Sequence, residues 1–123
     1  MTINAVHKAA MTAYIEAFNA KDLAAILALF NAQAKIYSPT QAAPIAPADF
    51  YPGLLERSKG TVFTLKNTFA GEQKNTGAFV FDYHKAKADG SVHTFECVDI
   101  CSFDDSGKIT EMRIIFDTKN LGL

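Results

Sequence analysis

Residues 95–103 read FECVDICSF, and the alternation of side chains along this stretch predicts a β-strand. Its core-facing side is expected to carry Phe95, Cys97, Asp99, Cys101 and Phe103. Four of these five residues are apolar or only weakly polar. The fifth is a carboxylic acid, and an ionised Asp is costly to desolvate without a partner. We therefore expect burial to raise the pKa of Asp99 and to keep the acid neutral, so that it can donate a hydrogen bond.

The residues before this strand are predicted to form helices. Apolar residues recur at helical spacing from about residue 3 to 19, and LAAILALF at 23–30 continues as a second helix, which Asp22 is placed to cap. The segment AKIYS at 34–38 is expected to be a short strand, followed by a loop rich in proline. A third helix is predicted over 47–58, broken by Pro52 and Gly53.

After Gly60 the apolar period changes to two, which is typical of strands. In the first of these strands, Phe63, Leu65, Asn67 and Phe69 are expected to share one face, and ADGS at 88–91 predicts a hairpin turn. Helices first and antiparallel strands last indicate an α+β class. We expect one cone-shaped domain over 1–123, with about three N-terminal helices packed in the concave face of a curved, mostly antiparallel sheet.

The opposite face of the late strands is also apolar. It carries Val80, Val98, Ile100 and Ile115, although the helices can cover only the concave side. We predict that this outer face packs against a second copy of the chain in a homodimer. The alternative is a monomer with an apolar surface.

Composition excludes several classes of function. The chain has 123 residues with 12 Lys plus Arg and 13 Asp plus Glu, and it lacks the basic stripe that a nucleic-acid surface needs. No run of 18 apolar residues and no secretory leader are present, so we expect a cytoplasmic protein without a membrane partner. Cys97 and Cys101 lie four positions apart on one strand, about 13 Å, which is too far for a disulfide. Without HExxH, a phosphate loop or a Cys/His cluster, we expect no metal and no cofactor.

Several motifs resemble those of the bacterial Δ5-3-ketosteroid isomerases. They are Tyr14, AFNAKDLAAILALF at 17–30, Pro39, Asp99, Phe103, GKI at 107–109 and EMRIIFDTKNL at 111–121. The resemblance spans nearly the whole chain and is blurred between about 40 and 90. It implies the cystatin-like, nuclear-transport-factor-like fold of the wider SnoaL-like superfamily, with a deep apolar pocket and a dimer through the sheet.

The resemblance also implies roles for individual residues. In these isomerases a protonated strand Asp, beside a helix Tyr, donates a hydrogen bond to the substrate's carbonyl oxygen as it becomes a dienolate. Asp99 and Tyr14 occupy the matching positions, and Tyr51 is a candidate member of the same network. The pocket for a small apolar molecule, similar to a steroid or a polyketide, is expected to be walled by Phe81, Phe103, Met112, Ile114 and Phe116.

One position departs from the family pattern. The family's general base is an Asp before the Pro that follows the first strand, and here that position is Ser38, whose hydroxyl is far too weak a base without an activating partner. Asp49, Asp82, His84 and His7 have no compelling claim to replace it. Four hypotheses remain: a steroid Δ-isomerase-like enzyme with impaired or altered activity, a non-catalytic binder of a flat phenol or enone, a polyketide cyclase or dehydratase using ionised Asp99 as base, and a dimerisation module with a filled core.

Overall fold

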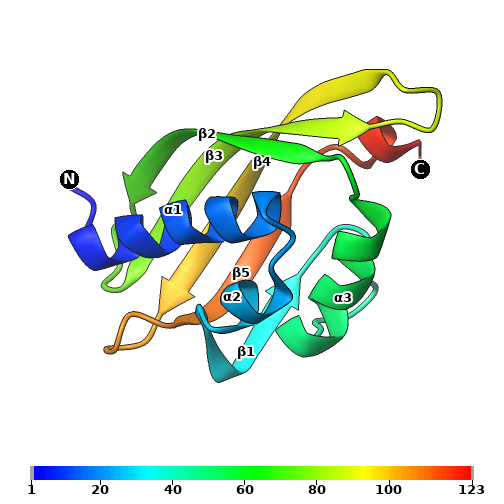
Figure 1. Ribbon diagram of the computed structural model, residues 1–123. Helices are drawn as coiled ribbons and strands as arrows, with labels where there is room; N and C mark the ends of the chain where they lie inside the picture. The colour runs from blue at the N-terminus through cyan, green and yellow to red at the C-terminus, as the bar shows by residue number, and fades with distance from the viewer. Residues whose placement is uncertain (1, 123) are drawn as a thin grey trace.

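Three helices pack against one face of a five-stranded sheet in the computed structural model, which describes residues 2–122 (Figure 1). The helices are α1 (Ala5–Asn19), α2 (Leu23–Leu27) and α3 (Pro47–Arg57), and a 3-10 turn, η1, covers Thr118–Leu121. The strands are β1 (Phe30–Tyr37), β2 (Val62–Ala70), β3 (Thr76–Ala86), β4 (Val92–Phe103) and β5 (Ile109–Ile115). The predicted α+β class is confirmed.

The sheet has the order β1-β5-β4-β3-β2, and every neighbouring pair is antiparallel except β1 and β5. The turn at 88–91 closes the β3–β4 hairpin as expected, since the Lys87 N–H donates to the Ser91 carbonyl over 2.9 Å. This hairpin extends beyond the helices and lies near η1 (Figure 1). No helix in residues 2–122 is long and apolar enough to cross a membrane.

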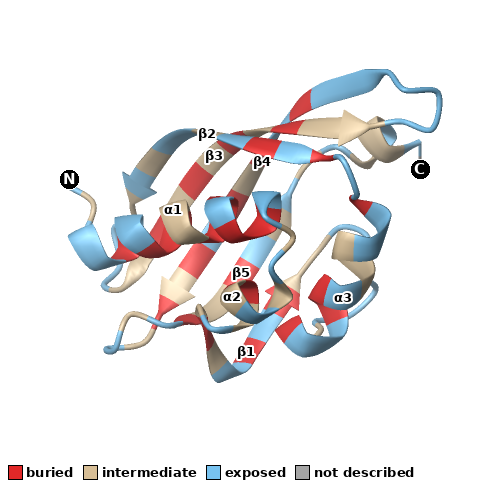
Figure 2. Ribbon diagram, in the orientation of Figure 1, coloured by how far each residue is buried: buried red, intermediate tan, exposed pale blue. Residues whose placement is uncertain are grey.

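Asn4 caps the start of helix α1, because its side-chain oxygen accepts from the backbone N–H groups of Val6 (2.8 Å) and His7 (3.3 Å). Its buried residues recur at helical spacing and form the stripe that faces the sheet: His7, Ala10, Met11, Tyr14, Ile15, Ala17 and Phe18 (Figure 2). Tyr14 therefore points into the molecule from the middle of the helix.

The second helix is shorter than its periodicity predicts. Asp22 caps it through the Ala25 N–H (3.0 Å), but it ends at Leu27, and Phe30 already begins β1. The cause is strand pairing. Phe30 lies opposite Ile109 of β5, and the Leu29 carbonyl accepts from the Ile109 N–H over 2.9 Å. Tertiary hydrogen bonds override the local helical pattern over 28–30.

The third helix is continuous, so the predicted break at Pro52 and Gly53 is wrong. Pro47 begins the helix, where a missing N–H costs nothing. Pro52 removes one intrahelical hydrogen bond. The burial of Phe50 and Tyr51 on the adjacent turn holds the segment in place, with 5% and 0% of their surfaces exposed.

The predicted common face of Phe63 and Phe69 is also wrong. The register between β2 and β3 shifts between Leu65 and Asn67, which is the signature of a β-bulge. One extra residue moves the following side chains to the opposite face. Phe63 is consequently buried, whereas Phe69 lies on the outer face with 47% of its surface exposed.

Strand β4 behaves as its alternation predicts. The core-facing residues of β4 are all buried: Phe95, Cys97, Asp99, Cys101 and Phe103 (Figure 2). In the register of the sheet, Asp99 lies between Phe79 of β3 and Ile114 of β5. The carboxyl group therefore projects from the middle of the sheet into the space beneath the helices.

Candidate ligand-binding site

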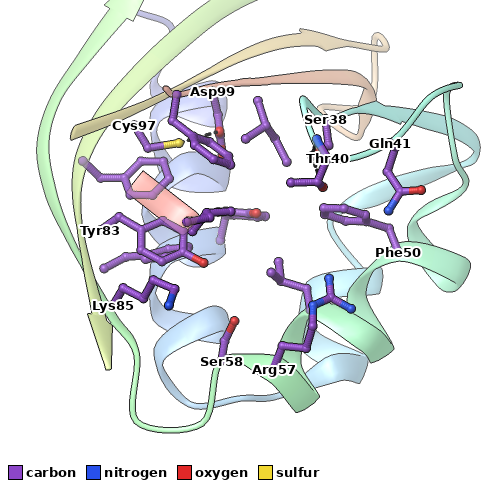
Figure 3. Close-up of a pocket in the computed structure, with 17 residues that line it drawn as sticks. Ser38, Thr40, Gln41, Phe50, Arg57, Ser58, Tyr83, Lys85, Cys97 and Asp99 are labelled. Carbon is purple, nitrogen blue, oxygen red and sulfur yellow. Dashed lines mark hydrogen bonds between the residues drawn. The ribbon is translucent and has the colours of Figure 1, made fainter. Parts of the chain in front are cut away.

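A cavity of about 470 Å³ opens between the concave face of the sheet, α3 and the loop after β1 (Figure 3). Six of the residues predicted for the site line it: Tyr14, Ser38, Phe81, Asp99, Ile114 and Phe116. Tyr51, Phe103 and Met112 are buried outside the lining. Phe103 stacks at 4.0 Å on His7, under the first turns of α1, and Met112 lies against Tyr51.

Asp99 has the one buried side-chain oxygen in residues 2–122 that lacks a hydrogen-bond partner. Only 1% of its surface is exposed, and no group in residues 2–122 hydrogen-bonds its Oδ2. Its Oδ1 is 3.7 Å from the Cys97 thiol, a weak donor. Burial raises the pKa of Asp99 from 3.8 to about 8. The carboxyl group is therefore mainly neutral at pH 7 and has a proton to donate.

Arg113 does not neutralise this acid. Its guanidinium pairs with Glu111 at 3.1 Å and lies 4.1 Å from the centre of the Tyr37 ring. A guanidinium beside Asp99 would favour the carboxylate and lower its pKa. Its position elsewhere leaves burial as the main influence on the Asp99 pKa.

Tyr14 and Tyr51 form a pair of linked hydroxyls. The Tyr51 O–H donates to the Tyr14 oxygen over 2.9 Å, with the Met112 sulfur 3.5 Å from the same Tyr51 oxygen. Burial raises the pKa of both phenols well above the ordinary value, and the charge of Asp99 adds to the rise at Tyr14. Since Tyr14 accepts from Tyr51, its own proton is available to a group in the cavity.

Ser38 lies at the cavity without a base beside it. Its hydroxyl oxygen is 2.8 Å from the Thr40 hydroxyl and accepts from the Thr40 N–H over 3.2 Å. The other carboxylates and imidazoles considered at the sequence level, Asp49, Asp82, His84 and His7, are not among the lining residues. Asp99 is consequently the one carboxyl group that the described lining contains.

Comparison with known proteins identifies the family. A model described as the SnoaL-like domain matches residues 11–112. The chain belongs to the SnoaL-like domain family. The narrower resemblance to ketosteroid isomerases remains a prediction. The comparison with curated proteins found no match at a significant level. The fold class is confirmed as the α+β arrangement of cystatin-like and NTF2-like proteins.

Solved structures share this fold at low sequence identity. TerC, co-crystallised with polyporic acid, is 19% identical with a TM-score of 0.81, over 96% of each chain. Rv0760c from Mycobacterium tuberculosis, in complex with estradiol-17β-hemisuccinate, is 17% identical with a TM-score of 0.78, over 94% of this chain and 97% of that one. SalBIII, an epoxide hydrolase/cyclase-like enzyme, is 16% identical with a TM-score of 0.78, over 93% and 92%.

This SnoaL-like domain has further lining residues that the sequence analysis missed. They are Thr40, Gln41, Phe50, Leu54, Arg57, Ser58, Phe63, Tyr83, Lys85, Cys97 and Leu121. Strand parity could have found four of them. On β4, Cys97 shares the inward face of Asp99, and on β3, Tyr83 and Lys85 share the inward face of Phe81. Phe63 pairs with Tyr83 across β2 and β3. The residues of α3 gave no comparable signal, because the rotation of that helix depends on packing between Tyr51 and the core.

Proposed function

We propose that this SnoaL-like domain binds a flat, largely apolar small molecule and holds its carbonyl or phenol oxygen between Tyr14 and Asp99. The observation that carries the proposal is the buried Oδ2 of Asp99, which has no hydrogen-bond partner in the described part of the chain and belongs to the same cavity lining as Tyr14. An unsatisfied buried polar group is costly in a folded protein. A ligand oxygen that accepts from both donors would remove that cost.

The remaining lining supports an apolar ligand. Aromatic and aliphatic side chains from three strands, from α3 and from the segment after β5 surround the space: Phe50, Leu54, Phe63, Phe81, Ile114 and Phe116. The volume of about 470 Å³ suits a ligand of a few fused or linked rings. The relatives TerC and Rv0760c, with polyporic acid and estradiol-17β-hemisuccinate, support this ligand class.

The same two donors would stabilise a negative charge that develops on a carbonyl oxygen, as in an isomerase that moves a double bond through an enolate. The missing element is a base, since Ser38 stands where the isomerases have an Asp. We therefore propose weak or altered isomerase activity in the native protein. A positioned base is worth about 10²–10⁴-fold in rate, so Ser38→Asp should raise conversion of a Δ5-3-ketosteroid by that order. No gain would argue for a binder or for other superfamily chemistry.

Binding of estradiol tests the proposal directly. We expect calorimetry at pH 7 to show saturable binding to the native protein and to Asp99→Asn, whose amide N–H can still donate. Asp99→Leu should lose about ten-fold or more in affinity, and Tyr14→Phe a similar amount. Affinity should also fall above pH 8 in the native protein, as Asp99 loses its proton, and remain level in Asp99→Asn. Equal affinity of Asp99→Leu and native protein would overturn the placement of the oxygen.

We further propose a homodimer through the outer face of the sheet. Val80, Val98 and Ile115 align across β3, β4 and β5, next to Ile100, and the bulge in β2 adds Phe69 to the same face. Ile100 and Ile115 are 41% and 51% exposed, which leaves apolar surface that a second copy could cover.

A further inference from the structure

Two cations stand at one end of the cavity without acidic partners. Arg57 and Lys85 both belong to the lining, and neither forms an ion pair with a carboxylate in the described part of the chain. The adjacent Glu56 pairs instead with Lys59 at 3.1 Å. The chain as a whole has a formal charge of -1, so this end of the cavity is not positive merely because the protein is basic.

Lys85 is placed by the alternation of β3. Phe79, Phe81, Tyr83 and Lys85 share the inward face, and Phe79 pairs with Asp99. Lys85 therefore lies six residues, or about 20 Å of strand, beyond the level of Asp99. It is half-buried, and the surface beyond it adds Lys87, Lys119 and His93 with no carboxylate among the residues that line that surface.

Arg57 is the last residue of α3, and its guanidinium folds back over the helix. A Cβ added at Gly53 would lie 2.9 Å from the Arg57 Nη1, so the absence of a side chain at Gly53 makes room for it. A cation at a helix C-terminus is favourable in any orientation that stays near the last turn. Figure 3 shows Arg57, Ser58 and Lys85 at the end of the cavity opposite Asp99.

We infer that this rim, Arg57 with Lys85, binds a carboxylate on the ligand. The inference rests on the proposed function and names its substrate class: an apolar acid whose neutral oxygen reaches Tyr14 and Asp99 while its carboxylate stays at the cavity mouth. The planar guanidinium offers paired N–H donors that match a carboxylate, and the ammonium adds a second positive charge. Asp99 is mainly neutral at pH 7, so the opposite end of the cavity does not repel the anion.

The test compares two probes that differ in one charge. Estradiol-17β-hemisuccinate has a phenol at one end and a carboxylate at the other, and its methyl ester keeps the shape without the charge. For partly exposed ion pairs we expect the native protein to prefer the acid by about three- to ten-fold at low salt, and the preference to shrink as salt is added. The double variant Arg57→Gln/Lys85→Gln should bind acid and ester equally. Lys59→Gln, which removes a nearby charge outside the cavity, should keep the preference.

Each outcome separates the two proposals. Equal affinity of native protein for acid and ester would overturn the inference and leave the proposed function standing. Binding of neither probe would overturn both. A preference that survives in the double variant would place the anion elsewhere and refute the role of the rim. Unchanged affinity of the double variant for the methyl ester shows that the cavity is intact, so a lost preference is then due to the missing charges.

Discussion

Replacing Asp99 by Asn should stabilise the protein at neutral pH, and the gain should depend on pH in a defined way. The ordinary pKa of this acid is 3.8, and burial raises it to about 8 in the folded protein. Between those values the unfolded chain has lost the proton that the folded chain retains. The unfolded state then binds fewer protons, so the free energy of unfolding falls as pH rises, by about 1.4 kcal/mol per pH unit.

The magnitude follows from this interval. At pH 7 the pH is about three units above the pKa of Asp99 in the unfolded chain, and the folded protein keeps Asp99 neutral over this interval. The free energy of unfolding is therefore lower by about 4 kcal/mol than it would be without this shift. Asn has nearly the same shape and never ionises, so Asp99→Asn escapes this cost. Near pH 4 the two proteins should be about equally stable, and the variant should lead by about 4 kcal/mol at pH 7 and level off above pH 8.

Urea unfolding of both proteins at intervals from pH 4.5 to 8.5 measures the difference. All other titratable groups are common to the two chains, so subtracting one curve from the other isolates Asp99. A difference that stays constant across this range would mean that Asp99 has an ordinary pKa in the folded state and is ionised at pH 7. That result would remove the neutral donor from which the proposed function is argued.

Three further predictions concern the fold and the assembly. Asn19→Ala should lower the free energy of unfolding in urea by about 1–2 kcal/mol, because the Asn19 side chain accepts from the Phe63 N–H (2.8 Å) and donates to the Phe63 carbonyl (2.9 Å) in β2. Gly107→Ala should cost about 1–2 kcal/mol from its φ of 88°, and more because the added Cβ would lie 2.6 Å from a Val6 methyl group. Gly90→Ala, with φ 87° and open space around the added Cβ, reports the backbone cost alone, so equal losses would exclude the Val6 contact. Ile100→Arg should convert the dimer to a monomer in sedimentation, and a native protein that already sediments as a monomer would refute the outer-face interface.

The sequence predicted those elements whose pattern is local. The alternation of β4 identified its buried face, including Asp99, and Asp22 marked the start of α2 correctly. The errors arose where a distant partner decides the structure. Residues 28–30 follow a helical pattern, yet Phe30 pairs with Ile109 of β5. The β2 bulge is likewise a matter of register against β3, and no residue type in β2 announces it.

The candidate site divides in the same way. Tyr14, Ser38 and Asp99 were selected by their positions in a family pattern, and the structure brings them to one cavity. The cationic rim was not predicted. The alternation of β3 could have placed Lys85 on the inward face, whereas Arg57 reaches the cavity only through the rotation of a continuous α3. The sequence pattern had predicted a break in that helix at Pro52 and Gly53.

Asp99 differs from a carboxylate with a purely structural role because no guanidinium lies beside it in the described part of the chain. A guanidinium beside the carboxyl group would satisfy both oxygens and ionise the acid, so that Asp99 would have no proton to donate. The cysteine that does contact it is a weak donor, and the nearby Tyr14 and Tyr51 keep their own protons because burial raises their pKa values as well. At the deep end of the cavity, the carboxyl group of Asp99 and the nearby phenols are thus protonated and uncharged. Such an environment discriminates in favour of ligands whose inserted end accepts hydrogen bonds, and against ligands whose inserted end is a cation that only donates.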